Sequence, residues 1–508
     1  MPGVPLLLRG ATVRTMDPRR PVARALLIDG DRVAAVLDAI RAPDGAGTGE
    51  RDAPAGAERL DLGGACVLPG FTDAHFHGPS WALARTELSL VDATSLADAL
   101  ARVRAALRPG AWLRGRGWRA ERWPPGDVPT RAALDAACGD ARVALRAHDG
   151  HSLWLSSAAL AAAGGDLEVQ GGVVERDARG EPTGVLREEA AWRFEARHLR
   201  ADRAEALAAL RAALPAAAAE GVVAVHDKDG HRGAPELYAA LAKRGELTLR
   251  VWQSRPAERL DEIPAGGGYV KAFLDGTLGS RTARLLDGSG VEIMSAGALA
   301  DLVRRAAARR VAVAVHAIGD RANRDALDAF EASAPAWRPL GLRPRIEHAQ
   351  CVHPADVPRF ARLGVTASVQ YTHATSDRDL AERLWADRIA HAYPYRSLHA
   401  AGARLAGGSD APVEPLSPLA GVRAAVARTA DDRPAWHPEQ ALEVDAALES
   451  FTSAPAWLEH AEARRGRLRP GLLADLVVLD RDPHADLHGA RVVATMLGGS
   501  WVHGPFVP

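Results

Sequence analysis

From about residue 200 onward, short apolar runs alternate with longer runs in which apolar residues recur at helical spacing. An example is the helical segment 298–310 (ALADLVRRAAARR), which precedes the apolar run VAVAVHAIGD. Near-continuous apolar strands separated by helices predict parallel strands covered on both faces. Eight strand–helix units predict an α/β fold built on a TIM-like (β/α)8 barrel. The expected strands are 67–77, 222–227, 247–254, 269–276, 311–320, 345–350, 365–373 and 404–410.

Two parts of the chain fall outside this alternation. Residues 80–200 carry their own strand-like runs and a hairpin-like segment, GGVVERDARGEPTGVLRE, so we expect an inserted cap domain. An insertion after a barrel strand emerges at the catalytic face, where it can roof the site. Both chain ends are short and β-rich, and neither could bury a core alone. We expect 1–66 and 415–508 to form a composite β-sandwich domain that also carries the final barrel helices, and 67–79 and 201–414 to form the barrel.

Composition excludes several classes of function. The 508 residues have a formal net charge of −1, which gives no reason to expect nucleic acid or a membrane surface as partner. No stretch resembles a signal peptide or a membrane span. The three scattered cysteines do not form a disulfide pattern, which favours a reducing cytoplasm: Cys66, Cys138 and Cys351. We expect a small-molecule substrate as partner, and the sequence leaves a homodimer open.

The expected strand ends carry the candidate chemistry. His75 and His77 lie two residues apart, so in a strand both would point to one face. Imidazole nitrogen is a good zinc ligand, although a lone pair of histidines is more often partly buried and bonded to backbone. Three other expected strands also end in a ligand type, namely His316, His348 and Asp410. Because barrel sites form at the carboxyl ends of the strands, this pattern predicts a metal centre there.

Lys271 is unusual because the chain uses arginine for nearly all of its 63 basic residues. It lies in the apolar run YVKAFLDG, where a charged amine would be costly to bury. A neutral lysine can add carbon dioxide and become an anionic carbamate that bridges two metal ions, and the alternative is a snorkelling or salt-bridged side chain. Two dications balanced by a carbamate, Asp410 and hydroxide would leave a charge suited to an oxyanion. Lys228, between two aspartates, is expected to be charged at the surface or rim.

The chain resembles the amidohydrolase superfamily, and within it the YtcJ-like or amidohydrolase-3 branch, to which N-substituted formamide deformylases belong. The stretches that carry the resemblance run nearly end to end: LPGFTDAHFHG, LRGRGW, DGHSLWLSSAAL, VKAFLDGTLGSRTA, VHAIGDRANRDALDAFE, RIEHAQ, AYPYRSL, GSDAPVEPLSPL and GLLADLVVLDRDP. The resemblance implies zinc or another divalent metal. It also implies that His75 and His77 bind one ion, that His316 and His348 bind the other, and that carboxylated Lys271 bridges them. Asp410 would be both a ligand and the proton shuttle.

The expected function is hydrolysis of a non-peptide carbon–nitrogen bond, in an amide, N-formyl or N-acyl amine, through a metal-activated hydroxide. Two alternatives stay open: a deaminase or lactone or ester hydrolase on the same scaffold, and a metal-free scaffold protein without activity.

The candidates for substrate contact lie outside the strand ends. Asp149 and His151 of the cap could reach the substrate, although a buried turn bonded to its own backbone is equally consistent. His373 follows the seventh strand, and Arg281 could clamp an anionic substrate or lie at the surface. Glu347 is assigned to structure, because in a regular strand it would point away from the side of His348.

Overall fold

The computed structural model describes residues 4–38, 54–164 and 166–506. Its centre is a sheet of eight parallel strands in which β21 lies against β8 and nearly closes a barrel. A parallel bridge between Phe76 and Ala411 completes this contact. The predicted TIM-like barrel is therefore confirmed. Its strands in order are β8 (Phe71–Phe76), β15 (Val222–Asp227), β16 (Arg250–Pro256), β17 (Tyr269–Phe273), β18 (Ala312–Ala317), β19 (Arg345–His348), β20 (Thr366–Val369) and β21 (Leu405–Gly407).

The run expected as one strand at 67–77 is two strands in the structure. β7 (Cys66–Pro69) pairs with strands of the terminal domain, and β8 belongs to the barrel. Gly70 separates them, and a Cβ atom there would lie 2.5 Å from Val223 of β15. Glycine thus lets the chain pass close to β15 while it changes sheets.

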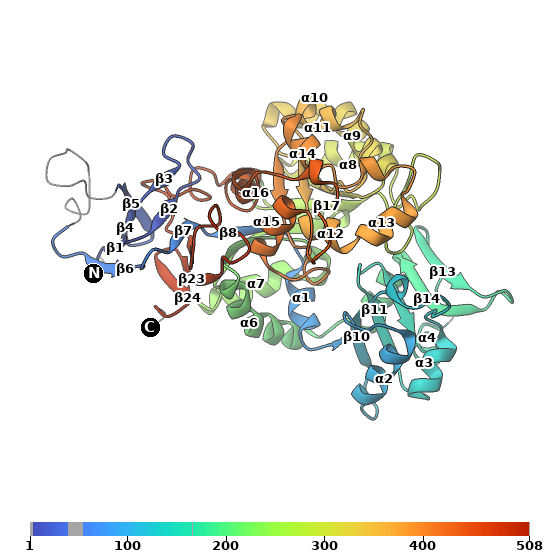
Figure 1. The fold of residues 1–508 in the computed structure, drawn as a ribbon. Helices are drawn as coiled ribbons and strands as arrows, with labels where there is room; N and C mark the ends of the chain where they lie inside the picture. Colours follow the sequence, from blue (N-terminus) through green and yellow to red (C-terminus); the bar gives the residue numbers. More distant parts are fainter. Residues whose placement is uncertain (1–3, 39–53, 165, 507–508) are drawn as a thin grey trace.

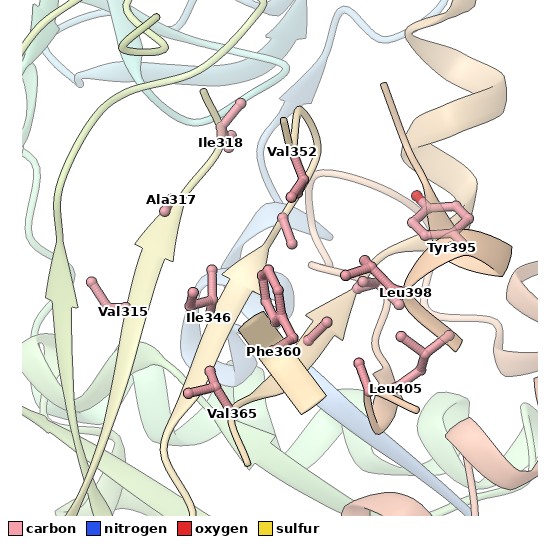
Figure 2. Packing of buried hydrophobic residues seen from close by; sticks show 14 of the residues in the cluster. Val315, Ala317, Ile318, Ile346, Val352, Phe360, Val365, Tyr395, Leu398 and Leu405 are labelled. Atoms are coloured by element: carbon pink, nitrogen blue, oxygen red, sulfur yellow. The ribbon is translucent and has the colours of Figure 1, made fainter. Parts of the chain in front are cut away.

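Helices cover the outside of the barrel, and the alternation of each strand sorts its side chains between helices and interior. Val315 of β18 and Ile346 of β19 pack in the same cluster as Phe360 of a covering helix (Figure 2). His316, the next residue after Val315, lines the cavity instead. The covering helices are α1 (Gly78–Ala84), α6 (Arg203–Ala219), α7 (Ala234–Lys243), α8 (Ala296–Ala308), α9 (Asp320–Ala332), α10 (Ala334–Trp337), α11 (Val357–Leu363), α12 (Tyr371–Ser376), α13 (Arg378–Leu384), α14 (Tyr395–Ala400), α15 (Pro418–Ala427), α16 (Val444–Ser450) and α17 (Ser453–Leu458).

The two ends of the chain meet in a β-sandwich beside the barrel (Figure 1). Its sheets share one apolar core, to which Leu26 contributes from one sheet and Val67 and Leu476 from the other. β22 pairs with β7, so the ends of the chain are joined within one sheet. The strands are β1 (Leu6–Arg9), β4 (Ala25–Asp29), β5 (Arg32–Leu37) and β6 (Glu58–Asp61) in one sheet, and β2 (Thr12–Arg14), β3 (Val22–Ala23), β7, β22 (Leu476–Leu479), β23 (Val492–Leu497) and β24 (Ser500–His503) in the other.

The segment inserted between α1 and α6 forms a separate cap with a six-stranded sheet (Figure 1). Trp118, Trp123 and Trp154 pack together in its core. The strands are β9 (Leu88–Ser89), β10 (Leu113–Trp118), β11 (Val143–Ala147), β12 (Ser152–Leu155), β13 (Gly172–Arg176) and β14 (Pro182–Glu188), and the helices are α2 (Leu96–Ala106), α3 (Arg131–Cys138), α4 (Ser157–Ala161) and α5 (Glu189–His198). In the described ranges, no helix has both the length and the apolar character needed to span a membrane.

Candidate metal centre and active site

One cavity of about 540 Å³ lies between the cap and the carboxyl ends of the barrel strands. The structure brings all six residues predicted as ligands to its wall, from five strands or the loops that follow them: His75, His77, Lys271, His316, His348 and Asp410. Three of them, His75, His348 and Asp410, place ligand atoms within 4.8 Å of one another. This grouping is the one that strand-end placement predicts for a barrel.

Buried carboxylates fix the orientation of the first two histidines. His75 Nδ1 lies 2.7 Å from Glu347 Oε2, and His77 Nδ1 lies 2.8 Å from Asp229 Oδ1. An ionised carboxylate only accepts hydrogen bonds, so each Nδ1 carries the proton and each Nε2 presents a lone pair. These Nε2 atoms lie 3.3 and 3.1 Å from Asp410 Oδ1. Imidazoles held by carboxylates in this way are the usual arrangement around protein-bound metals.

Glu347 lies at the centre of a buried charge network, and here two expectations were wrong. Lys228 is not at the rim: it is 2% exposed, and its Nζ donates to Glu347 Oε1 at 2.7 Å. Glu347 does not point away from the site, because it binds His75. Alternation fails at His348, whose φ of 75° turns the end of β19 so that both side chains lie near His75. Arg345 Nε, 2.8 Å from Glu347 Oε1, supplies a second cation.

The remaining histidine ligand candidates come from β18 and β19. The ring centroids of His316 and His348 are 4.5 Å apart, and His348 also lies 4.7 Å from His75. His316 Nε2 donates to the Gly276 carbonyl at 3.1 Å, which leaves its Nδ1 as the ligand atom. His348 and Asp410 both have positive φ, of 75° and 61°. Strained backbone of this kind concentrates at functional sites, where the surrounding structure maintains it.

Lys271 is buried, and its Nζ has no hydrogen-bond partner among the described residues. The amine lies 4.6 Å from the centroid of the Phe273 ring. Burial lowers the pKa of Lys271 to about 8, although Glu347 and Asp410 act in the opposite direction. The lowered pKa means that neutral amine, the form that reacts with carbon dioxide, is far more abundant at neutral pH than for an exposed lysine.

The donor set fits a divalent cation. When both rings are neutral, the lone pairs of His75 Nε2 and His77 Nε2 face the acceptor Asp410 Oδ1, and a cation between these atoms would bind all three. His348 Nδ1 is also buried without a hydrogen-bond partner in the described ranges. Imidazole nitrogens and carboxylate oxygens are the donors that zinc and similar metals bind.

The cap completes the wall of the cavity. Asp149 accepts hydrogen bonds from the hydroxyls of Thr277 and Ser280 on the loop after β17, at 2.6 and 2.7 Å, and also from the backbone N–H of His151. It therefore joins cap to barrel and braces its own turn. His151 Nδ1 lies 2.6 Å from Glu188, and the His151 ring is 5.3 Å from that of His316.

The other two candidates lie in different surroundings. His373 is buried, with Nε2 3.8 Å from Asp410 Oδ2, and it lines a smaller cavity that adjoins the ligand residues. Arg281 is exposed and is not among the described residues that line either cavity. Its φ of 58° places it on the tight turn of the loop after β17.

Sequence reasoning missed Glu347, Asp229 and Glu188 as groups that orient histidines. The spacing of Arg345 and Glu347 carried a signal, because two charged residues at positions i and i+2 of an apolar strand share its interior face. No local signal marked Glu188, whose partner lies 37 residues away.

Known proteins provide an independent comparison. The model of the amidohydrolase family matches residues 58–503. The chain is 31% identical to the putative amidohydrolase YtcJ of Bacillus subtilis (strain 168), over 94% of this chain and 97% of the relative. It is 29% identical to the N-substituted formamide deformylase of Arthrobacter pascens, over 97% of each.

A solved structure agrees with these relatives. The uncharacterized metal-dependent hydrolase from Pyrococcus horikoshii OT3 matches with a TM-score of 0.76 and 27% identity, over 94% of this chain and 98% of that one. The family match covers most of the chain and includes every strand of the barrel. The chain therefore belongs to the amidohydrolase family, whose enzymes hydrolyse carbon–nitrogen bonds other than peptide bonds.

Proposed function

We propose that this protein is a metal-dependent hydrolase of small non-peptide amides, of the N-formyl or N-acyl amine type. The observation that carries the proposal is the convergence of His75 Nε2 and His77 Nε2 on Asp410 Oδ1, with each Nδ1 held by a buried carboxylate. The formamide deformylase named above acts on the same kind of bond, which supports this substrate class.

His75, His77, His316, His348 and Asp410 would hold the metal. A divalent ion there supplies a Lewis acid for the amide carbonyl and a water whose pKa is lowered to about 7. Burial alone would raise the pKa of Asp410, but the neighbouring histidines outweigh it and hold that pKa well below the ordinary value. Asp410 therefore starts ionised, takes the proton from the attacking water and returns it to the leaving nitrogen.

Lys271 decides whether the site suits one ion or two. As an ammonium it would repel a second dication, whereas addition of carbon dioxide to its neutral amine forms a carbamate and releases a proton. The carbamate oxygens would bridge two ions. The burial of Lys271 and its lowered pKa support carboxylation, because both favour the neutral amine.

Metal content and turnover test the proposal together. We expect purified protein loaded with zinc in the presence of bicarbonate to bind two ions per chain and to hydrolyse N-formyl and N-acyl amines. Lys271→Arg should bind at most one ion. Asp410→Asn should stay folded and lose about 10²-fold or more of kcat, whereas Asp431→Asn, an exposed change of the same type, should be unaffected.

Other results would point to the alternatives. Release of ammonia from amino-substituted rings, or hydrolysis of lactones without amide turnover, would replace amide hydrolysis with deamination or ester hydrolysis. A protein that binds no metal with or without bicarbonate would be a scaffold instead.

A further inference from the structure

Four arginines line the large cavity, and one of them lacks the carboxylate partner that the other three have. The cavity is lined by Arg116, Arg146, Arg193 and Arg232. Arg146 pairs with Glu195 and Glu87, Arg193 pairs with Asp166, and Arg232 pairs with Glu195. Within the described ranges, Arg116 is the member of this set that has no carboxylate within 4.0 Å.

The nearest carboxylates are already engaged by other arginines. Glu195 Oε1 binds Arg146, and its Oε2 binds Arg232 at 2.6 Å. Glu87 Oε2 lies 3.3 Å from Arg146. Both glutamates are therefore paired with arginines other than Arg116.

Arg116 lies beside the rim that carries Asp410. Its Nε donates to the Ala84 carbonyl at 3.1 Å, and its Nη1 donates to the Pro412 carbonyl at 3.4 Å. Its Nη2 has no hydrogen bond to a described residue. Burial lowers the pKa of Arg116, although Glu87 acts in the opposite direction. A guanidinium that is partly desolvated and lacks an ion pair gains from an anionic ligand.

The same cavity is also lined by the apolar side chains of Trp192, Phe273, Ile293 and Met294. We propose that Arg116 binds a carboxylate of the substrate, which makes the substrate an N-acyl or N-formyl amino acid with an apolar side chain. This inference rests on the proposed amide hydrolysis. It also moves the anion clamp from Arg281, which is exposed, to the cap residue that faces the cavity.

A purely structural role for Arg116 would act on all substrates alike. Ala84 is the last residue of α1, and a cation is favourable at a helix C-terminus, so Arg116 also stabilises the contact between α1 and the cap. Comparison of charged and neutral substrates separates the two roles. Arg193→Gln is the matched control, because Arg193 lines the same cavity and pairs with Asp166.

The test compares N-formylmethionine with its neutral carboxamide. We expect Arg116→Gln to lower kcat/KM for the carboxylate by about 10- to 100-fold, mainly through KM, and to change the carboxamide less than about threefold. Arg193→Gln should leave the ratio between the two substrates unchanged. Equal losses on both substrates, or a wild-type enzyme that does not prefer the carboxylate, would overturn the role of Arg116.

A binding experiment keeps this result separate from the proposed function. Calorimetry of N-formylmethionine with Asp410→Asn, which leaves the ligand intact, should show tighter binding than with Asp410→Asn/Arg116→Gln. If amides are not turned over but this difference persists, amide hydrolysis fails and the anion site stands. If the affinities are equal, or neither protein binds the ligand, the anion site fails.

Discussion

Two histidine–glutamate pairs reach the cavity, one from the barrel and one from the cap. His75 Nδ1 is 2.7 Å from Glu347 in the barrel, and His151 Nδ1 is 2.6 Å from Glu188 in the cap. Both glutamates are fully buried. Their other partners differ: Lys228 and Arg345 bind Glu347, whereas the Thr282 hydroxyl binds Glu188.

The difference indicates that the barrel histidine is suited to metal binding and the cap histidine to contact with substrate. Burial alone would raise the pKa of Glu347, but Arg345 and Lys228 outweigh it and hold that pKa well below its ordinary value. Glu347 is therefore ionised, and His75 stays a neutral donor with its lone pair on Nε2, as a metal requires. Burial lowers the pKa of His75 to about 3, which also favours the neutral ring. Burial acts on His151 too, but Glu188 outweighs it and raises the pKa of His151. A histidine that holds its proton in this way can donate a hydrogen bond to substrate, which is the role we expect of His151.

The largest expected effect is on bound metal and kcat, and it should distinguish His75 from His151. We expect His75→Ala to lose bound metal and at least about 10³-fold of kcat, because a Lewis-acid contribution of several kcal/mol disappears. His151→Ala should keep its metal. Metal analysis after dialysis and amide turnover measure both. Equal loss of metal from the two variants would show that His151 is also a metal ligand, and would contradict the different roles of the two histidines.

The second-largest expected effect is on protein stability, which should depend more on Glu347 than on Glu188. Glu347→Gln leaves Lys228 and Arg345 buried without their anion, and we expect a loss of about 3–5 kcal/mol in the free energy of unfolding. Glu188→Gln leaves His151, which can release its proton when the carboxylate is lost, so its cost should be about 1–3 kcal/mol. Denaturant unfolding of the metal-free proteins measures both. Similar losses would mean that the charge network around Glu347 makes no additional contribution to the free energy of unfolding.

Asp229→Asn tests whether a carboxylate orients a metal-binding histidine, with less damage to the fold than Glu347→Gln. Asp229 holds His77 but is not bound to Lys228 or Arg345. We expect its metal affinity to fall about 10- to 100-fold. Competition with a chelator measures the change, and an unaltered affinity would contradict the idea that carboxylates orient these histidines.

The two histidines of this comparison were named as candidates from the sequence, and the two glutamates that hold them were not. Strand ends carry positional information, so His75, His316, His348 and Asp410 could be assigned to one rim from periodicity alone. Lys228 misled because its aspartate neighbours suggested solvent, whereas its partner Glu347 lies 119 residues away. Glu188 meets His151 through the folding of the cap, and Arg116 meets Ala84 and Pro412 only when the cap docks on the barrel. No sequence period encodes either contact.

Within the cap, His151 should affect turnover without affecting metal. We expect His151→Gln to lower kcat/KM by about tenfold through loss of one hydrogen bond to the substrate. Glu188→Gln should have a similar effect, and the double variant should be little worse than either single one, because the two residues act as a pair. Additive losses in the double variant would mean that Glu188 acts independently of His151.

The smallest effect should come from the contact that joins the cap to the barrel. Thr277→Val removes one hydroxyl from Asp149 and leaves that of Ser280, so we expect less than about 1.5 kcal/mol of stability to be lost. Turnover should fall less than that of His151→Gln, because Ser280 still fixes Asp149 and its turn. Ser280→Ala should behave similarly, and the double variant should lose more than the sum, since Asp149 then has neither hydroxyl. Simple additivity would show that Asp149 is held by its own turn, and that the cap places His151 without help from the loop after β17.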